Sequence, residues 1–151
     1  MAFLRFQTKP SEQSIKVWDA LKIVEQTEPG VDDGMPHGFP MSDFSDQFLI
    51  RQLEYSRRRN KAPLVSVPLN QLLATQNDVE RAGVAFHILH PNAVPAHTRT
   101  KFGHEFGHAD KPIVVRYNSE LHIVDGHHRL TALKLQDKEH ALVRFVDLDA
   151  P

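Results

Sequence analysis

The segment Ile123–Leu133 constrains the fold more than any other part of the sequence. An apolar strand pattern breaks at Asp125-Gly126, and a helical pattern follows that begins with two histidines and Arg129. The first-turn N–H groups of a helix and the positive end of its dipole attract anions. A guanidinium adds a planar set of donors that matches phosphate oxygens. The segment therefore predicts a phosphate-binding corner between a strand and a helix.

The composition places the chain among globular proteins with one main domain. Its 151 residues, 40% apolar and 25% charged, allow one hydrophobic core plus an extension. A net charge of −1 gives no overall attraction to nucleic acid, so such binding would need a local patch. The absence of cysteine excludes disulfides, thiolate zinc sites and cysteine nucleophiles. Without a secretory signal or a long apolar run, we expect a cytoplasmic protein with no membrane contact.

Residues 1–62 are predicted to form a helical N-terminal extension. A helix is expected over 11–28, because apolar residues recur there at helical spacing. Glycine and proline are frequent in 29–41, which predicts a loop. A second helix is expected over 43–59 with Ser42 as its N-cap.

Residues 63–151 show a mixture of strand and helix patterns, which predicts an α+β fold. His122 alternates with apolar neighbours, so we expect it to point outward from its strand. For 79–89 the pattern leaves helix and strand both open. The other expected elements are a strand at 64–69, a helical turn at 71–73 capped by Asn70, a long loop at 90–112, a β-hairpin at 112–124, a helix at 127–136 and a strand at 141–146.

This order of elements, with the stretches Val67–Gln76 and Pro112–Ala132, resembles the ParB/sulfiredoxin superfamily over residues 64–148. The resemblance implies a small mixed sheet with flanking helices over 63–151, preceded by the helical extension. It also implies that the glycine-containing turn and the arginine-bearing helix bind the phosphates of a nucleotide or of DNA.

The branches of this superfamily differ in chemistry. Sulfiredoxins place a cysteine in the turn, so the repair of sulfinic acids is excluded here. Chromosome-segregation ParB proteins carry a helix-turn-helix domain after the turn, and binding of partition sites in that way is not expected. The Asp-Gly-His-His-Arg spelling is most similar to free-serine kinases. Those kinases use a catalytic glutamate where this chain has Gln76, and Glu80 lies one helical turn further on.

Other members of the superfamily are ParB-like nucleases, and this resemblance assigns roles to the corner. Asp125 would hold Mg²⁺ or Mn²⁺ or act as a base, with a role as helix N-cap as the alternative. His127 or His128 would move a proton or activate water. Gly126 would serve the tight turn and let a phosphate approach the backbone. The expected phosphate and nucleotide ligands are Gly126, His127, His128, Arg129, Thr131 and Gln76.

A competing pattern lies in the long loop, where His104, Glu105 and His108 match the H-E-x-x-H spacing of zinc peptidases. Gly107 weakens a helix there, Pro112 limits it, and no third ligand follows at a family spacing. Zinc is therefore not favoured. Alternatively, the long loop that carries these histidines folds over the phosphate site as a lid, contributes metal ligands, or is simply solvated.

Arg57, Arg58, Arg59 and Lys61 form a local basic run. The run predicts contact with a nucleic-acid backbone, with a solvated helix end as the alternative.

Two classes of function follow from the sequence. The first is metal-dependent phosphoester chemistry, with a nuclease or nucleotide hydrolase ahead of a small-molecule kinase of the serine type. The second is a non-catalytic module that binds a nucleotide, DNA or a protein. The sequence leaves the oligomeric state open.

Overall fold

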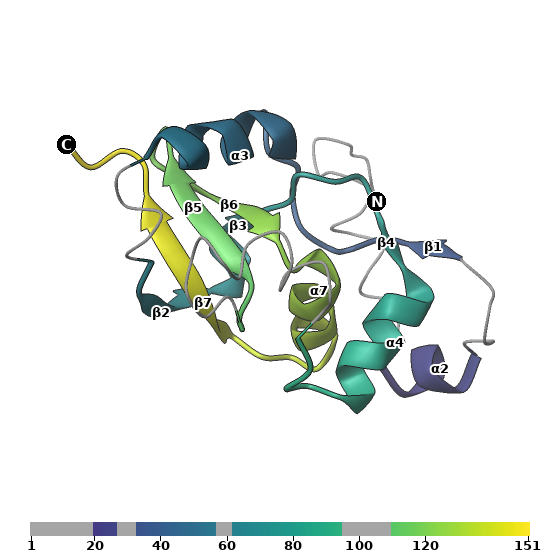
Figure 1. Cartoon of the computed structure of the whole chain (residues 1–151). Helices are drawn as coiled ribbons and strands as arrows, with labels where there is room; N and C mark the ends of the chain where they lie inside the picture. Colours follow the sequence, from purple (N-terminus) through teal and green to yellow (C-terminus); the bar gives the residue numbers. More distant parts are fainter. Residues whose placement is uncertain (1–19, 27–32, 57–61, 95–109) are drawn as a thin grey trace.

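A mixed five-stranded sheet forms the centre of the protein (Figure 1), in a computed structural model that describes residues 20–26, 33–56, 62–94 and 110–151. The spatial order is β2 (Leu64–Pro68), β7 (His140–Asp147), β5 (Ile113–Tyr117), β6 (Glu120–Asp125) and β3 (Leu72–Leu73). Neighbouring strands pair antiparallel in β2/β7 and β5/β6, and parallel in β7/β5 and β6/β3. The predicted α+β class is confirmed.

The central hairpin of β5 and β6 forms where the sequence predicts it. Its turn residues Asn118 and Ser119 have φ angles of 54° and 65°. Two consecutive left-handed residues match the twist of paired strands, which is why short polar residues occupy a tight hairpin turn. The alternation of β-branched residues on either side then sets the pairing of Arg116 with Leu121 and of Val114 with Ile123.

Helix α3 (Asp46–Tyr55) covers one face of the sheet, where its buried Leu49 and Leu53 pack among residues of β5, β6 and β7 (Figure 1). The helix begins later than predicted. Its N-cap is Ser45, whose hydroxyl accepts the N–H of Phe48 at 3.1 Å, so the prediction of Ser42 as N-cap is wrong. Both serines can cap a helix, and only Ser45 precedes the first residue with helical geometry.

Helix α7 (His127–Leu135) packs on the opposite face, with Leu130 in the core. Helix α4 (Arg81–Leu89) lies against α7, and α2 (Ala20–Gln26) lies against α4 (Figure 1). The segment left open between helix and strand is therefore a helix, preceded by β4 (Val79–Glu80), which pairs with β1 (Gly34–Met35).

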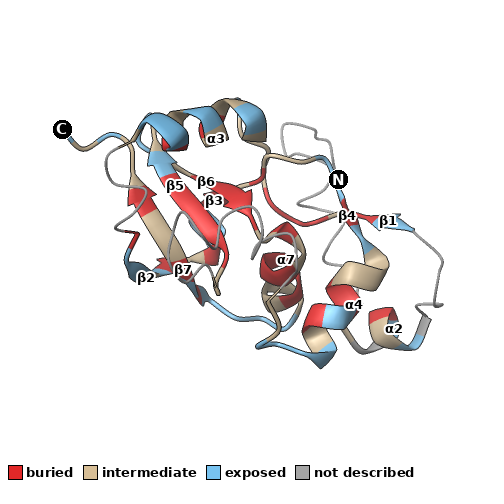
Figure 2. Cartoon of the chain, in the orientation of Figure 1, coloured by how far each residue is buried: buried red, intermediate tan, exposed pale blue. Residues whose placement is uncertain are grey.

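Two local predictions are wrong. Because helices cover both faces of the sheet, most of β6 is buried (Figure 2), and His122 in this strand is fully buried under α3 rather than outward-facing. Its Nε2 donates to the carbonyl of Tyr117 at 2.9 Å, and its Nδ1 accepts the hydroxyl of Ser42 at 2.7 Å. The predicted helical turn at 71–73 is instead a short 3₁₀ turn, η3 (Leu69–Gln71), followed by β3, because Leu72 pairs with β6.

The described part of the predicted N-terminal extension shares its cores with the rest of the chain. Leu49 packs with Val115, Phe39 with Leu130 in a second cluster, and Ile23 with residues of α4 and α7 in a third. These segments therefore cover faces of the sheet and of α4.

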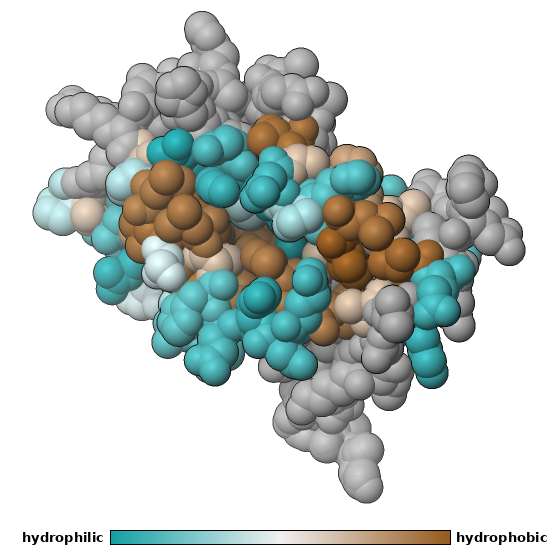
Figure 3. Space-filling view, turned by 90° about the horizontal axis from the view of Figure 1, so that it is seen from below, coloured by the Kyte–Doolittle hydropathy of each residue, from teal (hydrophilic) through white to brown (hydrophobic). Residues whose placement is uncertain are grey.

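The surface seen from below combines apolar and hydrophilic areas (Figure 3). None of the helices that the structure describes is long and apolar enough to span a bilayer. The exposed large apolar residues in the described ranges are Tyr55, Leu64, Phe86, Leu89 and Leu142.

Candidate functional site

The predicted phosphate-binding segment lies at one edge of the sheet, where the parallel strands β3 and β6 both end. In sheets with parallel strands, ligands bind beyond the carboxyl ends. Thr75 and Gln76 follow β3, Asp125 ends β6, and Pro112 precedes β5 at the same edge. We call the residues 75–76, 110–112 and 125–129 the α7 corner.

Gly126 is the N-cap of α7 and adopts the left-handed conformation, with φ 97° and ψ 24°. A Cβ at this position would lie 2.6 Å from the Cβ of Pro112. The turn and the packing of Pro112 therefore both require glycine, and Pro112 occupies the space that the missing side chain leaves. Since Gly126 is the N-cap, the alternative prediction of Asp125 as N-cap is wrong.

His127 is buried at the corner and ties the end of β3 to α7. Its Nε2 accepts the backbone N–H of Thr75 at 3.0 Å, while the Thr75 hydroxyl donates to the carbonyl of Ile123 at 2.7 Å. Burial, with smaller contributions from His37 and His128, lowers the pKa of His127 to about 3. The ring is thus neutral, with its proton on Nδ1. This geometry favours a positioning role, and the predicted role in proton transfer stays a prediction.

His128 joins α7 to the start of α4. Its Nε2 accepts the backbone N–H of Glu80 at 3.0 Å. The ring lies so close to α4 that a Cβ on Gly83 would be 2.5 Å from its Cδ2. Gly83 therefore makes room for His128, which is the more exposed of the two adjacent histidines.

Arg129 is buried and reaches the entry to β5. One guanidinium nitrogen donates to the backbone carbonyl of Asp110 at 2.7 Å, and Arg144 pairs with the carboxylate of Asp110 at 3.1 Å. Burial lowers the pKa of Arg129, an effect that Asp110 partly opposes. A guanidinium has five N–H donors, so the bond to Asp110 leaves others for a ligand.

The two remaining predicted ligands differ in their placement. Gln76 lies at the corner, where its side-chain amide donates to the carbonyl of Asp78 at 2.8 Å. Thr131 is fully buried, and its hydroxyl donates to the carbonyl of His127 at 2.7 Å. The structure thus brings Gln76 to the corner and turns Thr131 into the core, where it braces the helix.

A further buried histidine at the corner escaped the sequence analysis. His37 lies between β1 and α3, is 0% exposed, and is close enough to His127 to affect its pKa. It sits in a loop rich in glycine and proline, where no periodicity distinguishes buried from exposed positions. The sequence therefore carries no signal that would have singled it out.

The corner contains one buried carboxylate that could take part in binding a metal. Across the described ranges no group of three or more histidine, cysteine or acidic residues could hold a metal ion by itself. Mg²⁺ is commonly held by one or two carboxylates together with substrate phosphates. Asp125, 8% exposed, fits that arrangement.

Several predicted site residues lie outside the described residues. They are the possible metal ligands His104 and His108 with Glu105, and the basic run Arg57, Arg58, Arg59 and Lys61.

Comparison with known proteins assigns the family. A family model described as "Putative ParB-like nuclease" matches residues 65–150, which is more than half of the chain. The chain belongs to the ParB-like nuclease family. The predicted relation to the ParB/sulfiredoxin superfamily is confirmed, and membership indicates a function connected with nucleic acids. No curated protein and no solved structure gives a significant match.

Proposed function

We propose that the chain binds a phosphate group of a nucleic acid or nucleotide at the α7 corner and hydrolyses a phosphoester bond with the help of Mg²⁺ or Mn²⁺. One observation carries the proposal: Asp125 and Arg129, with opposite charges, are only 8% and 9% exposed within five residues. Charged side chains are rarely buried, and those that are concentrate at functional sites.

Arg129 and the backbone N–H groups at the start of α7 are the proposed phosphate ligands. The guanidinium is held in place by Asp110, which orients its remaining donors. Charged hydrogen bonds from fixed donors stabilise the charge that develops on phosphate oxygens during hydrolysis.

Asp125 is the proposed ligand of the divalent cation. When bound, the cation would neutralise negative charge on the phosphoester. Hydrolysis adds water to phosphorus and requires a proton on the leaving oxygen. We propose that His128 rather than His127 supplies this proton, because His128 is the less buried of the two adjacent histidines.

The activity test pairs two acidic residues at opposite ends of β6. Supercoiled plasmid, single-stranded DNA, RNA and nucleoside triphosphates are incubated with the protein and Mg²⁺ or Mn²⁺, and products are separated by electrophoresis or chromatography. Asp125→Asn is expected to lose about 100-fold or more in rate. The control Glu120→Gln removes the same charge from an exposed position and should retain the rate. Equal rates in both variants, or cleavage that persists in EDTA, would contradict the proposal.

A non-catalytic binding module is the second candidate. Its support is that the Nε2 atoms of His127 and His128 both accept backbone N–H groups, so these nitrogens already serve the fold. Binding of a substrate by the wild type without any product would favour this candidate. Adding serine to the nucleotide incubation tests the kinase alternative, for which Gln76 replaces the expected acid.

A further inference from the structure

The ring of His37 is fixed in a defined orientation inside the protein. Its Nδ1 accepts the backbone N–H of Phe39 at 2.9 Å, and the two rings stack with centroids 6.0 Å apart. A neutral imidazole that accepts at Nδ1 carries its proton at Nε2. His37 therefore presents an N–H donor at Nε2.

This donor lacks a well-formed hydrogen bond. The Nε2 atom is buried and has no hydrogen-bond partner among the residues that the structure describes. Buried polar atoms are nearly always paired, and an unpaired one in a native protein calls for a specific explanation, such as an absent ligand or water.

The surroundings of His37 place it at the α7 corner. Burial lowers its pKa, while a backbone contact of the ring with Gln76, short of a well-formed hydrogen bond to Nε2, raises that pKa in part. Asp78, Lys134 and His127 are its other electrostatic neighbours. The loop that carries His37 also runs beside the end of β3, since Ala74 exchanges backbone hydrogen bonds with residues 40 and 42.

We propose that the Nε2–H of His37 donates to an oxygen of the phosphoester ligand bound at the α7 corner. The inference rests on the proposed function and adds a residue to its binding site. It also extends the site beyond the family domain, because His37 precedes the matched range of residues 65–150. The lowered pKa keeps the donor uncharged at neutral pH, so it contributes direction rather than attraction.

Two substitutions separate the ligand contact from the fold contact. In His37→Asn the side-chain oxygen can replace Nδ1 as acceptor for Phe39, but no donor remains at the Nε2 position. In His37→Gln the amide group reaches the Nε2 position, while the acceptor for Phe39 is lost. Thermal unfolding of both variants reports the fold contact.

Binding is measured by titration with ATP and, separately, with an eight-nucleotide DNA strand, using Ca²⁺ in place of Mg²⁺ to slow turnover. We expect His37→Asn to bind the probe that the wild type binds about tenfold more weakly, although it unfolds at a temperature no lower than that of His37→Gln, which should regain part of the affinity. In wild-type protein with ¹⁵N-labelled histidine, the Nε2–H resonance that His37→Asn lacks should shift when the probe is added.

The possible outcomes are distinct. One outcome is unchanged affinity in His37→Asn, or an Nε2–H resonance that does not shift when the probe is bound. Either result would show that Nε2 donates to a buried water only, and would overturn the inference while leaving the proposed function intact. Affinity that merely follows thermal stability in both variants would assign His37 to the fold and also overturn it. Failure of the wild type to bind either probe would overturn the proposed function together with the inference.

Discussion

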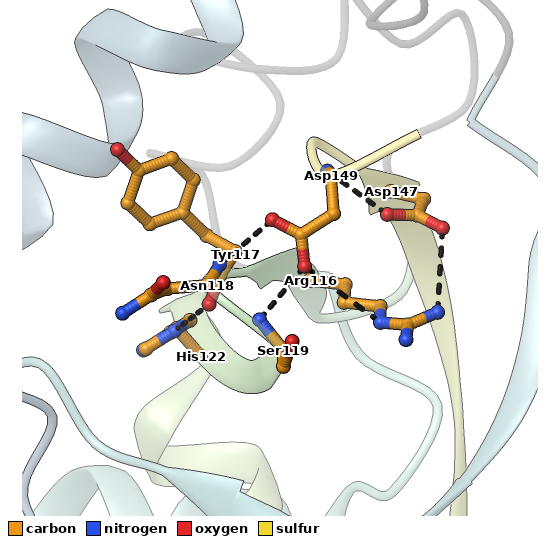
Figure 4. Close-up of polar contacts among 7 residues, drawn as sticks. All are labelled: Arg116, Tyr117, Asn118, Ser119, His122, Asp147 and Asp149. Carbon is orange, nitrogen blue, oxygen red and sulfur yellow. Dashed lines mark hydrogen bonds and ion pairs between the residues drawn. The ribbon is translucent and has the colours of Figure 1, made fainter. Parts of the chain in front are cut away.

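The two ends of the β5–β6 hairpin both gather charged residues, but they do so differently. At the turn, the carboxylate of Asp149 accepts the N–H groups of Asn118 and Ser119 at 2.7 and 2.8 Å and lies 3.8 Å from Arg116 (Figure 4). Asp147 pairs with the same arginine at 3.6 Å. Every partner in this group is supplied by the protein.

At the hairpin turn Arg116 and Asp149 are also exposed, and Asp147 is partly exposed. The N–H groups of Ser119 and Asn118, with Arg116, hold the pKa of Asp149 below its usual range. At the α7 corner, in contrast, Asp125, His127 and Arg129 are buried, and the nearby His37 keeps a donor without a partner among the described residues. The charges at the turn satisfy one another and stabilise it, whereas the buried N–H donor of His37 has capacity left for a ligand.

The largest expected effect tests whether the corner is as constrained as its geometry indicates. Gly126→Ala should lower the free energy of unfolding by about 2–5 kcal/mol, because it combines a left-handed backbone with a contact to Pro112. Gly34→Ala is the matched control, since its added Cβ would meet Asp78 at an ordinary 3.5 Å. Urea unfolding measures both, and similar losses in the two variants would refute the constraint.

The next prediction concerns the pH dependence of stability. Unfolded His127 takes up a proton near pH 6.5, whereas in the folded protein its pKa is about 3. The unfolded state therefore binds more protons between these values, and stability falls as the pH drops below 6.5. By pH 4.5 the loss from this residue should reach about 2–3 kcal/mol.

His127→Gln, which can still accept the N–H of Thr75 but does not titrate, should remove this part of the pH dependence. The control His140→Gln changes an exposed histidine and should retain the wild-type profile. Urea unfolding at several pH values compares the three proteins. A His127→Gln profile parallel to that of the wild type would mean that the ring is not buried as a neutral acceptor.

A third prediction compares one arginine from each end of the hairpin. Arg129→Ala should weaken binding of the nucleotide or DNA probe by more than about 1 kcal/mol, as expected for a charged hydrogen bond. Arg116→Ala removes an equal charge from the turn and should leave affinity nearly unchanged. Isothermal titration at fixed salt concentration measures the affinity of both variants for the probe. Equal losses of affinity would show that Arg129 contributes only a general electrostatic attraction.

The smallest effect is expected at the turn itself. Asp149→Asn weakens the acceptor for Asn118 and Ser119 and should lower the melting temperature slightly, with no change in probe binding. Its destabilisation relative to the wild type should shrink as the pH falls and Asp149 becomes protonated, because its folded pKa is depressed. A change in probe affinity would contradict the separation of the two hairpin ends.

Local signals in the sequence were sufficient for part of the fold. The Asp125-Gly126 break located the start of α7, and alternation located β5 and β6, because both depend on neighbouring residues. The parallel pairing of β3 with β6 depends on distant residues, so Leu72 looked helical. His122 was misplaced for a related reason: alternation assumes one solvated face, and α3 covers that face.

The residues of the candidate site could be predicted from the sequence to a similar extent. The Asp-Gly-His-His-Arg motif identified Asp125 and Arg129 as candidate site residues. The structure adds that both side chains are buried. It could not show that Thr131 bonds back to His127 within the helix, since that depends on which side of α7 meets the sheet. Nor could it show His37, whose position follows from the path of a loop beside β3.

The N-terminal segments and the sheet share hydrophobic cores, which has a practical consequence for the expression of shortened versions of the protein. A protein shortened to the matched range 65–150 would lose Leu49 and Leu53 from one side of the sheet, and Phe39 from the other. The uncovered apolar surfaces would favour aggregation during recombinant production. If such a fragment were inactive, the cause would be its poor solubility, and the result would say nothing about the activity of the whole chain.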